Sequence, residues 1–270
     1  MTREEMLERK RALGYTNQMI SQLSGVPSAT VQKILSGTTK APRYETLQAL
    51  EHVLAVPTAS VSDSAGFVRE SLPDYQYDSS GKKPGEYTLE DYLALPDEPR
   101  VELIDGVFYD MAGPNNGHQI LITELLLRLK EHVRDNGGSC MPLVSPLDVQ
   151  LDCDEKTIVQ PDLMVVCDRS KITWPRVVGA PDLVIEILSP STRKKDMFIK
   201  LNKYLNAGVR EYWMIDLQRK EVYVYDFEGE DYPKFYTFAD TVPVAIFGGK
   251  CKIDFSELYE EMRFLYEQEE

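Results

Sequence analysis

The stretch that decides the fold is Val159-Gln-Pro-Asp-Leu-Met-Val-Val166, followed after a loop by Pro181-Asp-Leu-Val-Ile-Glu-Ile-Leu-Ser189 and a lysine-rich helical pattern to Lys203. Both apolar runs have the length and the Val, Ile and Leu content of buried strands, which predicts two neighbouring strands. An acid interrupts each run, because Asp162 opens the first and Glu186 lies inside the second. A buried carboxylate is costly unless it is paired or holds a cation. The pattern, with lysines downstream, therefore predicts a site for a hard divalent ion.

Strand geometry selects the partner of Glu186. Alternate residues of a strand share a face, which aligns Asp182 with Glu186 but leaves them about 13 Å apart. One ion bound at about 2.3 Å cannot join groups at that distance. A neighbouring strand lies only about 5 Å away. Asp162, at the start of the previous strand, is therefore the predicted partner of Glu186, and Asp182 is expected to cap or kink the entry to its strand.

Length and composition bound the class of protein. The chain has 270 residues, of which 43% are hydrophobic, which suits one large domain or two unequal ones with a real core. No apolar run approaches the roughly 20 residues that span a bilayer, so no membrane partner is expected. The N-terminus is charged and has no apolar signal region, which predicts that nothing directs export.

The spacing of the cysteines indicates the cellular compartment in which the protein is expected. They show no Cys-x-x-Cys spacing, and three lie in or near strand-like runs, where buried free thiols are expected. With three scattered histidines, this usage argues against a zinc site and predicts a cytoplasmic protein. The four cysteines are Cys140, Cys153, Cys167 and Cys251.

Charge is unevenly distributed. The net charge of −14 argues against a general polyanion binder. Residues 1–56 contain seven Lys or Arg and five Asp or Glu, giving +2, so the remainder contains 23 basic and 39 acidic residues, giving −16. The asymmetry predicts two parts with different partners.

The N-terminal segment has the pattern of a small helical bundle. Gly14, the turn Ser24-Gly-Val-Pro27 and Gly37 separate the periodic runs, and Thr16 and Ser28 are the predicted N-caps. A helix, a short turn containing Gly and a second helix that starts with small polar residues is the arrangement that enters a DNA major groove. The predicted helices are Arg3–Leu13, Asn17–Leu23, Ser28–Leu35 and Tyr44–Leu54.

This segment resembles the repressor-like helix-turn-helix family. The resemblance rests on Thr16, Ile20, Ser21, Ser24-Gly-Val26, Thr30-Val31, Ile34, Gly37, Pro42, Thr46-Leu47 and Leu50. In that family the third helix reads bases, which implies DNA contacts by Gln18, Ser28, Ala29, Thr30, Gln32 and Lys33. The sequence departs from the family at Ser21, where Ala is usual, and only Lys33 supplies a cation on the reading helix. A helical bundle that binds protein is the alternative.

The pattern changes after residue 56. Ser, Asp, Pro and Gly dominate up to Glu86, most clearly in Asp78-Ser-Ser-Gly-Lys-Lys-Pro-Gly85, which predicts a linker. We therefore expect a helix-turn-helix domain at 1–56, a linker at 57–86 and a second domain at 87–270.

The second domain alternates helices and strands. Helices covering a mixed sheet make it an α/β sandwich. The predicted order is a short helix Leu89–Leu95 capped by Thr88, a hairpin Arg100–Met111 turning at Asp105-Gly106, a helix His118–Asn136, a strand Leu143–Leu151, the two central strands, a helix Lys195–Ala207 ending at Gly208, strands Tyr212–Asp216 and Val222–Tyr225, a further strand within Phe235–Phe247, and a helix Phe255–Glu267.

From about Tyr87 to Leu258 the sequence resembles the Uma2-like branch of the PD-(D/E)xK nuclease superfamily, a group of restriction-endonuclease-like proteins. The resemblance implies the fold of that superfamily, a restriction-endonuclease-like α/β sandwich. It rests on Tyr87-Thr-x-Glu-Asp-Tyr92, Glu102-Leu-Ile-Asp-Gly106, His118, Gln160-Pro-Asp162, Pro181-Asp-Leu-Val-Ile-Glu186, Ser189-Pro-Ser-Thr192, Asp196, Lys200, Tyr204, Gly208-Val209 and Glu211-Tyr-Trp213.

The resemblance implies metal-dependent hydrolysis of phosphodiester bonds in DNA. Asp162 and Glu186 would bind Mg²⁺ or Mn²⁺, which polarises the phosphate and lowers the pKa of the attacking water. The superfamily places a lysine two residues after the second acid, but this chain has Leu188 there. Lys200, on the following helix, is the predicted substitute that positions water or neutralises charge. Lys195 and Lys203 are alternatives for that lysine, and Glu102 is a candidate third ligand.

Several alternatives stay open at this point. Asp162 could be a turn residue and Glu186 an ion-pair partner of Lys200 alone. His118 could cap its helix, bond within the core or contact substrate. The leading hypothesis is a DNA-targeted Mg²⁺-dependent nuclease that forms a homodimer, by analogy with helix-turn-helix proteins. The rival is a DNA-binding regulator whose nuclease-like domain serves dimerisation or sensing, and a protein-interaction adaptor is the third hypothesis.

Overall fold

The computed structural model describes residues 2–12, 17–24, 26–39, 42–54, 81–96, 100–111, 113–151, 155–189, 193, 195–229 and 233–267. The chain forms two compact units, Met1–Arg69 and Glu70–Glu270, and we describe each by itself. The division falls inside the predicted linker 57–86, most of which lies outside the described residues. Residues 82–85 lie against the larger unit, because Lys82 pairs with Asp91 and Gly85 N donates to Gly106 O.

The smaller unit is a helical bundle, as the periodicity predicts. Its helices are α1 (Arg3–Ala12), α2 (Asn17–Ser24), α3 (Ser28–Leu35) and α4 (Tyr44–Leu54). A core that includes Ile20, Val31 and Leu50, each fully buried, holds α2, α3 and α4 together. The predicted cap of the third helix is wrong: α3 starts at Ser28 with Pro27 in the N-cap position. The predicted cap Thr16 lies outside the described residues.

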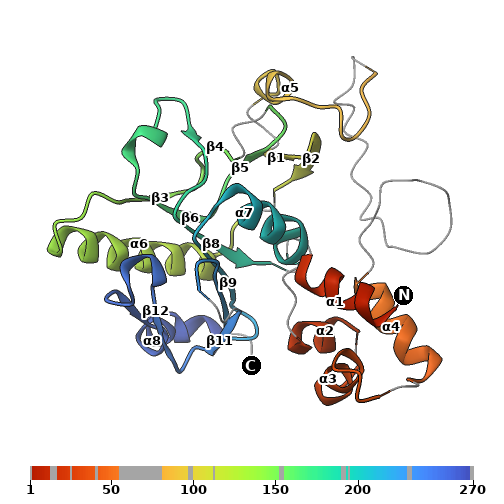
Figure 1. The fold of residues 1–270 in the computed structure, drawn as a ribbon. Helices are drawn as coiled ribbons and strands as arrows, with labels where there is room; N and C mark the ends of the chain where they lie inside the picture. The colour runs from red at the N-terminus through yellow and green to blue at the C-terminus, as the bar shows by residue number, and fades with distance from the viewer. Residues whose placement is uncertain are drawn as a thin grey trace. The chain divides into compact units, whose positions relative to one another are not determined.

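A six-stranded mixed sheet organises the larger unit (Figure 1). Its order is β11-β10-β9-β8-β6-β3, and only the central pair β8 and β9 runs parallel. The strands are β3 (Met141–Val144), β6 (Leu163–Val166), β8 (Leu183–Leu188), β9 (Glu211–Asp216), β10 (Glu221–Asp226) and β11 (Lys234–Thr237). Every residue of β6, β8 and β9 is buried, which matches strands covered on both faces and confirms the two predicted central strands.

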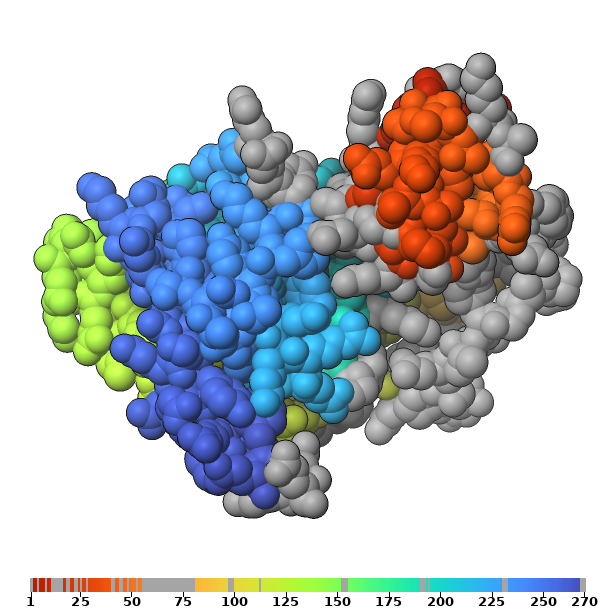
Figure 2. All heavy atoms as spheres, turned by 90° about the horizontal axis from the view of Figure 1, so that it is seen from below, coloured from red at the N-terminus to blue at the C-terminus, as the bar shows by residue number. Residues whose placement is uncertain are grey.

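Helices cover both faces of this sheet. On one face, α6 (Asn116–Asp135) and α8 (Phe255–Tyr266) pack their apolar sides on alternate residues of the strands, such as Leu163, Ile185 and Trp213. On the other face, a π-helix, η2 (Lys195–Lys200), continues into α7 (Leu201–Ala207), whose Tyr204 ring packs 4.9 Å from that of Tyr212. Figure 2 shows the face on which the blue C-terminal segments lie beside α6, which α8 contacts.

A second sheet holds the N-terminal part of the larger unit. Its order is β2-β1-β5-β4-β7, and α5 (Leu89–Leu93) lies before it in the chain, with the predicted cap Thr88 in a capping box with Asp91. The strands are β1 (Val101–Ile104), β2 (Val107–Asp110), β4 (Val149–Gln150), β5 (Ile158–Val159) and β7 (Val177–Val178). The predicted hairpin is confirmed, because Asp105 and Gly106 both have positive φ in the two-residue turn between β1 and β2.

Three predicted elements are wrong in detail. The alternation in Leu143–Leu151 is divided between β3 and β4, which belong to different sheets and are separated at Ser145-Pro146. The predicted helix Lys195–Ala207 begins as a π-helix and becomes an α-helix only at Leu201. The strand expected within Phe235–Phe247 is divided into β11 and β12 (Thr241–Pro243), followed by a 3₁₀ turn, and β12 pairs with β13 (Lys252–Asp254).

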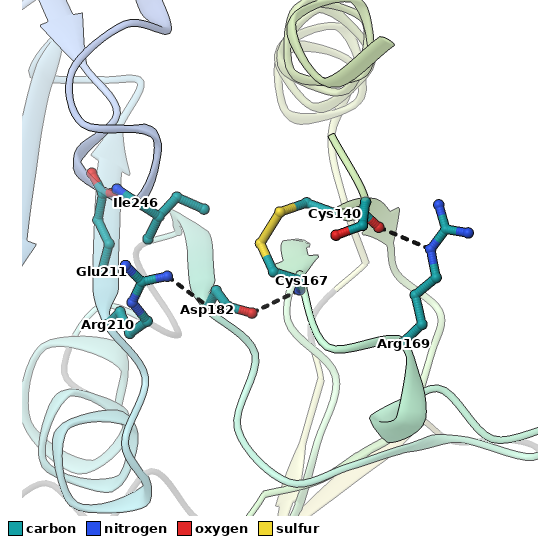
Figure 3. The surroundings of a disulfide bond; sticks show 8 residues. Cys140, Cys167, Arg169, Asp182, Arg210, Glu211 and Ile246 are labelled. Atoms are coloured by element: carbon teal, nitrogen blue, oxygen red, sulfur yellow. Dashed lines mark hydrogen bonds and ion pairs between the residues drawn. A yellow bond between two sulfur atoms is a disulfide. The ribbon is translucent and has the colours of Figure 1, made fainter. Parts of the chain in front are cut away.

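The prediction of free thiols is wrong for two cysteines. Cys140 and Cys167 form a disulfide (Figure 3). The register explains it: β3 pairs antiparallel with β6 and sets Met141 opposite Val166, so the preceding and following residues also face each other. Cys251 is free and buried, as predicted. Free thiols were part of the argument for a cytoplasmic protein. The disulfide between the ends of β3 and β6 removes that part of the argument.

Asp182 has a structural position, as the spacing argument predicts. Its carboxylate accepts hydrogen bonds from the backbone N–H of Cys167 and from Arg210 Nη1, at 2.7 and 3.1 Å (Figure 3). It therefore fixes the entry to β8 against the neighbouring strands. In the part of the chain that the structure describes, no helix has both the length and the apolar character needed to cross a bilayer.

Candidate functional site

A cavity of about 340 Å³ opens where the two sheets meet. The five-stranded sheet contributes Glu102 from β1, the six-stranded sheet contributes Glu186 from β8, and Asp162 lies on the segment that joins β5 to β6. Lys195 and Lys200 reach the cavity from η2. The acids and the lysine that the sequence singles out thus line one cavity, although Glu102 comes from a different sheet.

Glu186 is a buried acid of the cavity. It is 3% exposed and lies on the face of β8 that η2 and α7 cover. Its Oε1 accepts hydrogen bonds from Lys200 Nζ at 2.8 Å and from Tyr204 OH at 2.7 Å. Burial, with the nearby charge of Glu186, raises the pKa of Tyr204 well above its usual value, so the phenol stays a donor.

Glu102 is fully buried and anchors both lysines. Lys200 Nζ lies 2.7 Å from Oε1, and Lys195 Nζ lies 2.7 Å from Oε2. The backbone N–H of Gln160 also donates to Oε1, at 3.0 Å. Lys195 and Lys200 are five residues apart, which is one turn of the i→i+5 π-helix. The π-helix therefore brings both ammonium groups to the same carboxylate.

The buried acids of this cluster differ in how readily they bind a proton. Glu102, Glu186 and Asp196 all lie near the Lys200 ammonium group, which is 3.7 Å from Asp196. Burial alone would raise the pKa of Glu102, but Lys200 and Lys195 outweigh it and lower that pKa to about 2. Burial raises the pKa of Glu186 to about 8 against the pull of Lys200, and Asp162, Asp196 and Glu102 add to the rise. Of Glu102 and Glu186, Glu186 is therefore the acid that binds a proton more readily.

Asp162 lies opposite Glu186. The antiparallel register pairs Leu163 with Ile185, and one step further along it sets Asp162 against Glu186. The Asp162 Oδ2 accepts a hydrogen bond of 2.8 Å from the backbone N–H of Ile187. The same oxygen lies 3.0 Å from Nε2 of His118, at the start of α6. His118 thus contacts an acid of the site, which leaves its Nδ1 buried and without a hydrogen-bond partner.

The donor set suits a hard cation in part. Asp162 and Glu186 supply two carboxylates from adjacent strands, the number by which Mg²⁺ is commonly held while it keeps several waters. Glu102 is less suited as a third ligand, because both of its oxygens already accept from lysines. Within the described ranges, no three His, Cys, Asp or Glu side chains gather in a way that could hold a metal ion. The residues present therefore fit a two-carboxylate site, and Glu102 as a ligand stays a prediction.

The candidate lysines have distinct positions. Lys200, predicted to replace the lysine missing at Leu188, contacts Glu186 directly. Among the acids that the structure describes, Lys195 pairs with Glu102 alone, and Lys203 pairs with Asp105 at 2.6 Å, in the turn of the β1–β2 hairpin. The geometry favours Lys200 for the predicted role, and that role itself stays a prediction.

The sequence assigned no role to Arg100, and it named Tyr204 only as part of the family pattern. Arg100 lines the cavity, and its Nη2 donates to Gln160 Oε1 at 2.6 Å and to Ser145 Oγ at 2.9 Å. Tyr204 bonds to Glu186. Spacing could have found Arg100, because it lies two residues before Glu102 and alternate residues share a strand face.

The predicted DNA contacts lie on α2 and α3. In α3, Ala29, Gln32 and Lys33 are exposed and Thr30 is half-buried, while Val31, Ile34 and Leu35 are buried. This helix thus presents one polar face outward, as a reading helix requires. The side chains of Gln18 and Ser28 lie outside the described residues.

The fold and the cavity define a restriction-endonuclease-like α/β unit accompanied by a helix-turn-helix unit. The family model of Uma2, described as "Putative restriction endonuclease", matches residues 89–249, and a helix-turn-helix family model matches residues 6–61. The chain therefore belongs to the Uma2 family and carries a helix-turn-helix segment, as the sequence patterns predict.

Two relatives are similar to part of the chain. The "Uncharacterized protein slr1290" of Synechocystis sp. is 29% identical over 139 residues, which cover 50% of this chain and 72% of that protein. A crystal structure of "a putative nuclease belonging to DUF820" from Anabaena variabilis is 23% identical with a TM-score of 0.54, covering 64% of this chain and 97% of that one. At this identity the structural likeness supports the fold.

Proposed function

We propose that the protein is a metal-dependent nuclease that hydrolyses phosphodiester bonds of DNA and is targeted by its helix-turn-helix unit. The observation that carries the proposal is the pairing of Asp162 with Glu186 across β6 and β8, with Lys200 donating to Glu186 inside the same cavity. Family membership and the name of the Anabaena protein support the reaction class.

The residues would divide the work as follows. Asp162 and Glu186 would hold Mg²⁺ or Mn²⁺, and a bound ion supplies a Lewis acid and a more acidic water. His118 and the backbone N–H of Ile187 fix the Asp162 carboxylate. Glu102 holds the Lys200 ammonium in position, where it can neutralise charge on the phosphate. Tyr204, which donates to Oε1, helps to orient Glu186.

Targeting would come from the smaller unit. Residues outside 1–56 carry a net charge of −16, so the larger unit does not attract DNA by charge alone. The exposed side chains of α3 would supply the contacts to base edges and phosphates. We expect the protein to act as a homodimer and in the cytoplasm, where DNA is accessible.

A cleavage assay tests the proposal. Plasmid and single-stranded DNA are incubated with Mg²⁺ or Mn²⁺ and with the parent, Asp162→Asn or Glu186→Gln. Asp110→Asn serves as matched control, because Asp110 is an exposed acid at the end of β2, outside the cavity. We expect cleavage by the parent and the control and a loss of at least about 100-fold in both site variants. Cleavage that survives both site changes would refute the proposal.

A DNA-binding regulator with an inactive nuclease-like unit is the second candidate. The observation in its favour is that lysine and tyrosine donors already satisfy the buried carboxylates of Glu102 and Glu186. Salt-sensitive DNA binding by the parent, without cleavage at any tested metal, would support the regulator.

A further inference from the structure

Arg100 lies in the cavity without an acidic partner. Its guanidinium donates from Nη2 to two neutral oxygens, Ser145 Oγ and Gln160 Oε1, and its Nε is buried with no hydrogen-bond partner. No ion pair joins it to any acid among the described residues. A guanidinium has five N–H donors, so most of its donor capacity is unused.

The lysines and the histidine that line the cavity already contact acids. Of the described residues that line it, Lys195 is bound to Glu102, and Lys200 is shared by Glu102, Glu186 and Asp196. His118 lies on Asp162. Among the described residues that line the cavity, Arg100 is therefore a positive group that an entering anion could bind without displacing a carboxylate.

Arg100 is also held close to the proposed metal-binding segment. Gln160, which accepts from it, lies two residues before Asp162. Ser145 accepts from it through Oγ, and the backbone N–H of Ser145 donates to the carbonyl oxygen of Asp162 at 3.1 Å. Both supports of the guanidinium are thus connected to Asp162.

We propose that Arg100 is an anion-binding residue of this cavity that holds a non-bridging oxygen of a nucleic-acid phosphodiester. The planar guanidinium suits phosphate oxygens, which accept two parallel N–H bonds. Bound phosphate would also use the N–H groups of Nη1, which donate to no described residue. The inference deepens the proposed nuclease function and rests on it for the identity of the substrate.

The test uses the full chain with Mn²⁺ and the dinucleotide thymidylyl-(3′→5′)-thymidine, whose single phosphodiester is too short to engage a helix-turn-helix unit. Phosphorus NMR line width reports binding, and cleavage of plasmid gives kcat and KM. The variants are Arg100→Gln and Arg100→Lys. Arg169→Gln is the matched control, because Arg169 is exposed, lies outside the cavity and donates to a backbone carbonyl.

We expect Arg100→Gln to weaken dinucleotide binding at least tenfold and to raise the KM for DNA. Arg100→Lys should fall between it and the parent, because it keeps the charge but loses the fork of donors. All variants should bind Mn²⁺ within twofold of the parent, which a merely structural role of Arg100 would not predict. The control should bind dinucleotide like the parent.

The outcomes separate the two proposals. Unchanged dinucleotide binding in Arg100→Gln, or no binding by the parent, would overturn the role of Arg100 even if plasmid is cleaved. Loss of Mn²⁺ binding in both Arg100 variants would overturn it in favour of a structural role. Arg100-dependent dinucleotide binding without any cleavage would support the anion site and refute the nuclease.

Discussion

Glu186 and Glu102 both pair with the ammonium group of Lys200, but they differ in how readily they bind a proton. Glu102 has two lysines and its pKa falls to about 2, whereas Glu186 has only the shared Lys200 and its pKa rises to about 8, chiefly through burial. The difference separates their roles, since Glu102 is a fixed charge and Glu186 can exchange a proton for a metal ion.

The proton on Glu186 predicts how metal affinity depends on pH. A metal ligand must be deprotonated, and Glu186 is protonated below its raised pKa of about 8. Affinity for Mn²⁺ should therefore rise about tenfold per pH unit between about 6 and 8 and level off above that, because one proton leaves per ion bound. Electron paramagnetic resonance of free Mn²⁺ at a series of pH values measures it.

The variant Glu186→Gln provides the comparison, because it removes the titrating ligand. Its residual Mn²⁺ affinity should be weak and flat over the same range. A flat profile in the parent would contradict the assignment of the proton to Glu186.

At the residue scale, the sequence was informative where chemistry is unusual. Acids in apolar runs predicted Asp162 and Glu186, and the resemblance to the Uma2-like pattern predicted Lys200, with Lys195 and Lys203 as alternatives. It could not show that Lys195 shares Glu102, because the same side chains suit α- and π-helices and only the latter aligns residues five apart.

At the scale of elements, the β3–β6 pair is cross-linked. The disulfide Cys140–Cys167 closes 27 residues of chain between the end of α6 and the end of β6. A cross-link of this loop size stabilises the folded state by about 3 kcal/mol. In a unit of this size, the paired substitution Cys140→Ser with Cys167→Ser should lower Tm by about 6–12 °C.

Thermal unfolding with and without a reducing agent measures this contribution. The parent should lose stability on reduction, while the doubly substituted chain should not respond. Mass spectrometry of alkylated, unreduced peptides should recover the linked pair. Two alkylated cysteines at these positions in the native protein would contradict the cross-link.

The β3–β6 pair also shows why the sequence predicted free thiols at Cys140 and Cys167. The spacing of Cys140 and Cys167 carries no signal, and their proximity depends on the register of β3 against β6. Likewise, the alternation of Leu143–Leu151 is that of a single strand, but the chain changes sheet after Val144. Local pattern predicts a strand, while its sheet and register depend on contacts distant in sequence.

At the scale of the whole molecule, two units with separate cores predict separable functions. In the smaller unit, Lys33→Gln should weaken duplex binding and reduce the salt dependence of the binding constant by about one unit, because one phosphate contact is lost. It should leave Mn²⁺ binding unchanged. Fluorescence anisotropy of labelled duplex at several salt concentrations measures the first effect.

Lys252, an exposed lysine of β13, serves as the control for the loss of one positive charge. Lys252→Gln should change neither property, since Lys252 lies outside the cavity and outside the helical unit. If Lys33→Gln instead bound DNA like the parent, the smaller unit would be better explained as a protein-binding bundle. The order of helices in that unit followed from periodicity and turn residues, but its partner did not, because bundles of this kind serve several functions.

The cavity lies at a seam between two sheets, and a bridge of only three residues, Gln160 to Asp162, spans that seam from β5 to β6. Its length sets which side chains face inward. One inserted residue would reverse the alternation and turn Asp162 from the hollow toward the opposite side. The length of the segment from Gln160 to Asp162 therefore determines whether the Asp162 carboxylate faces the cavity.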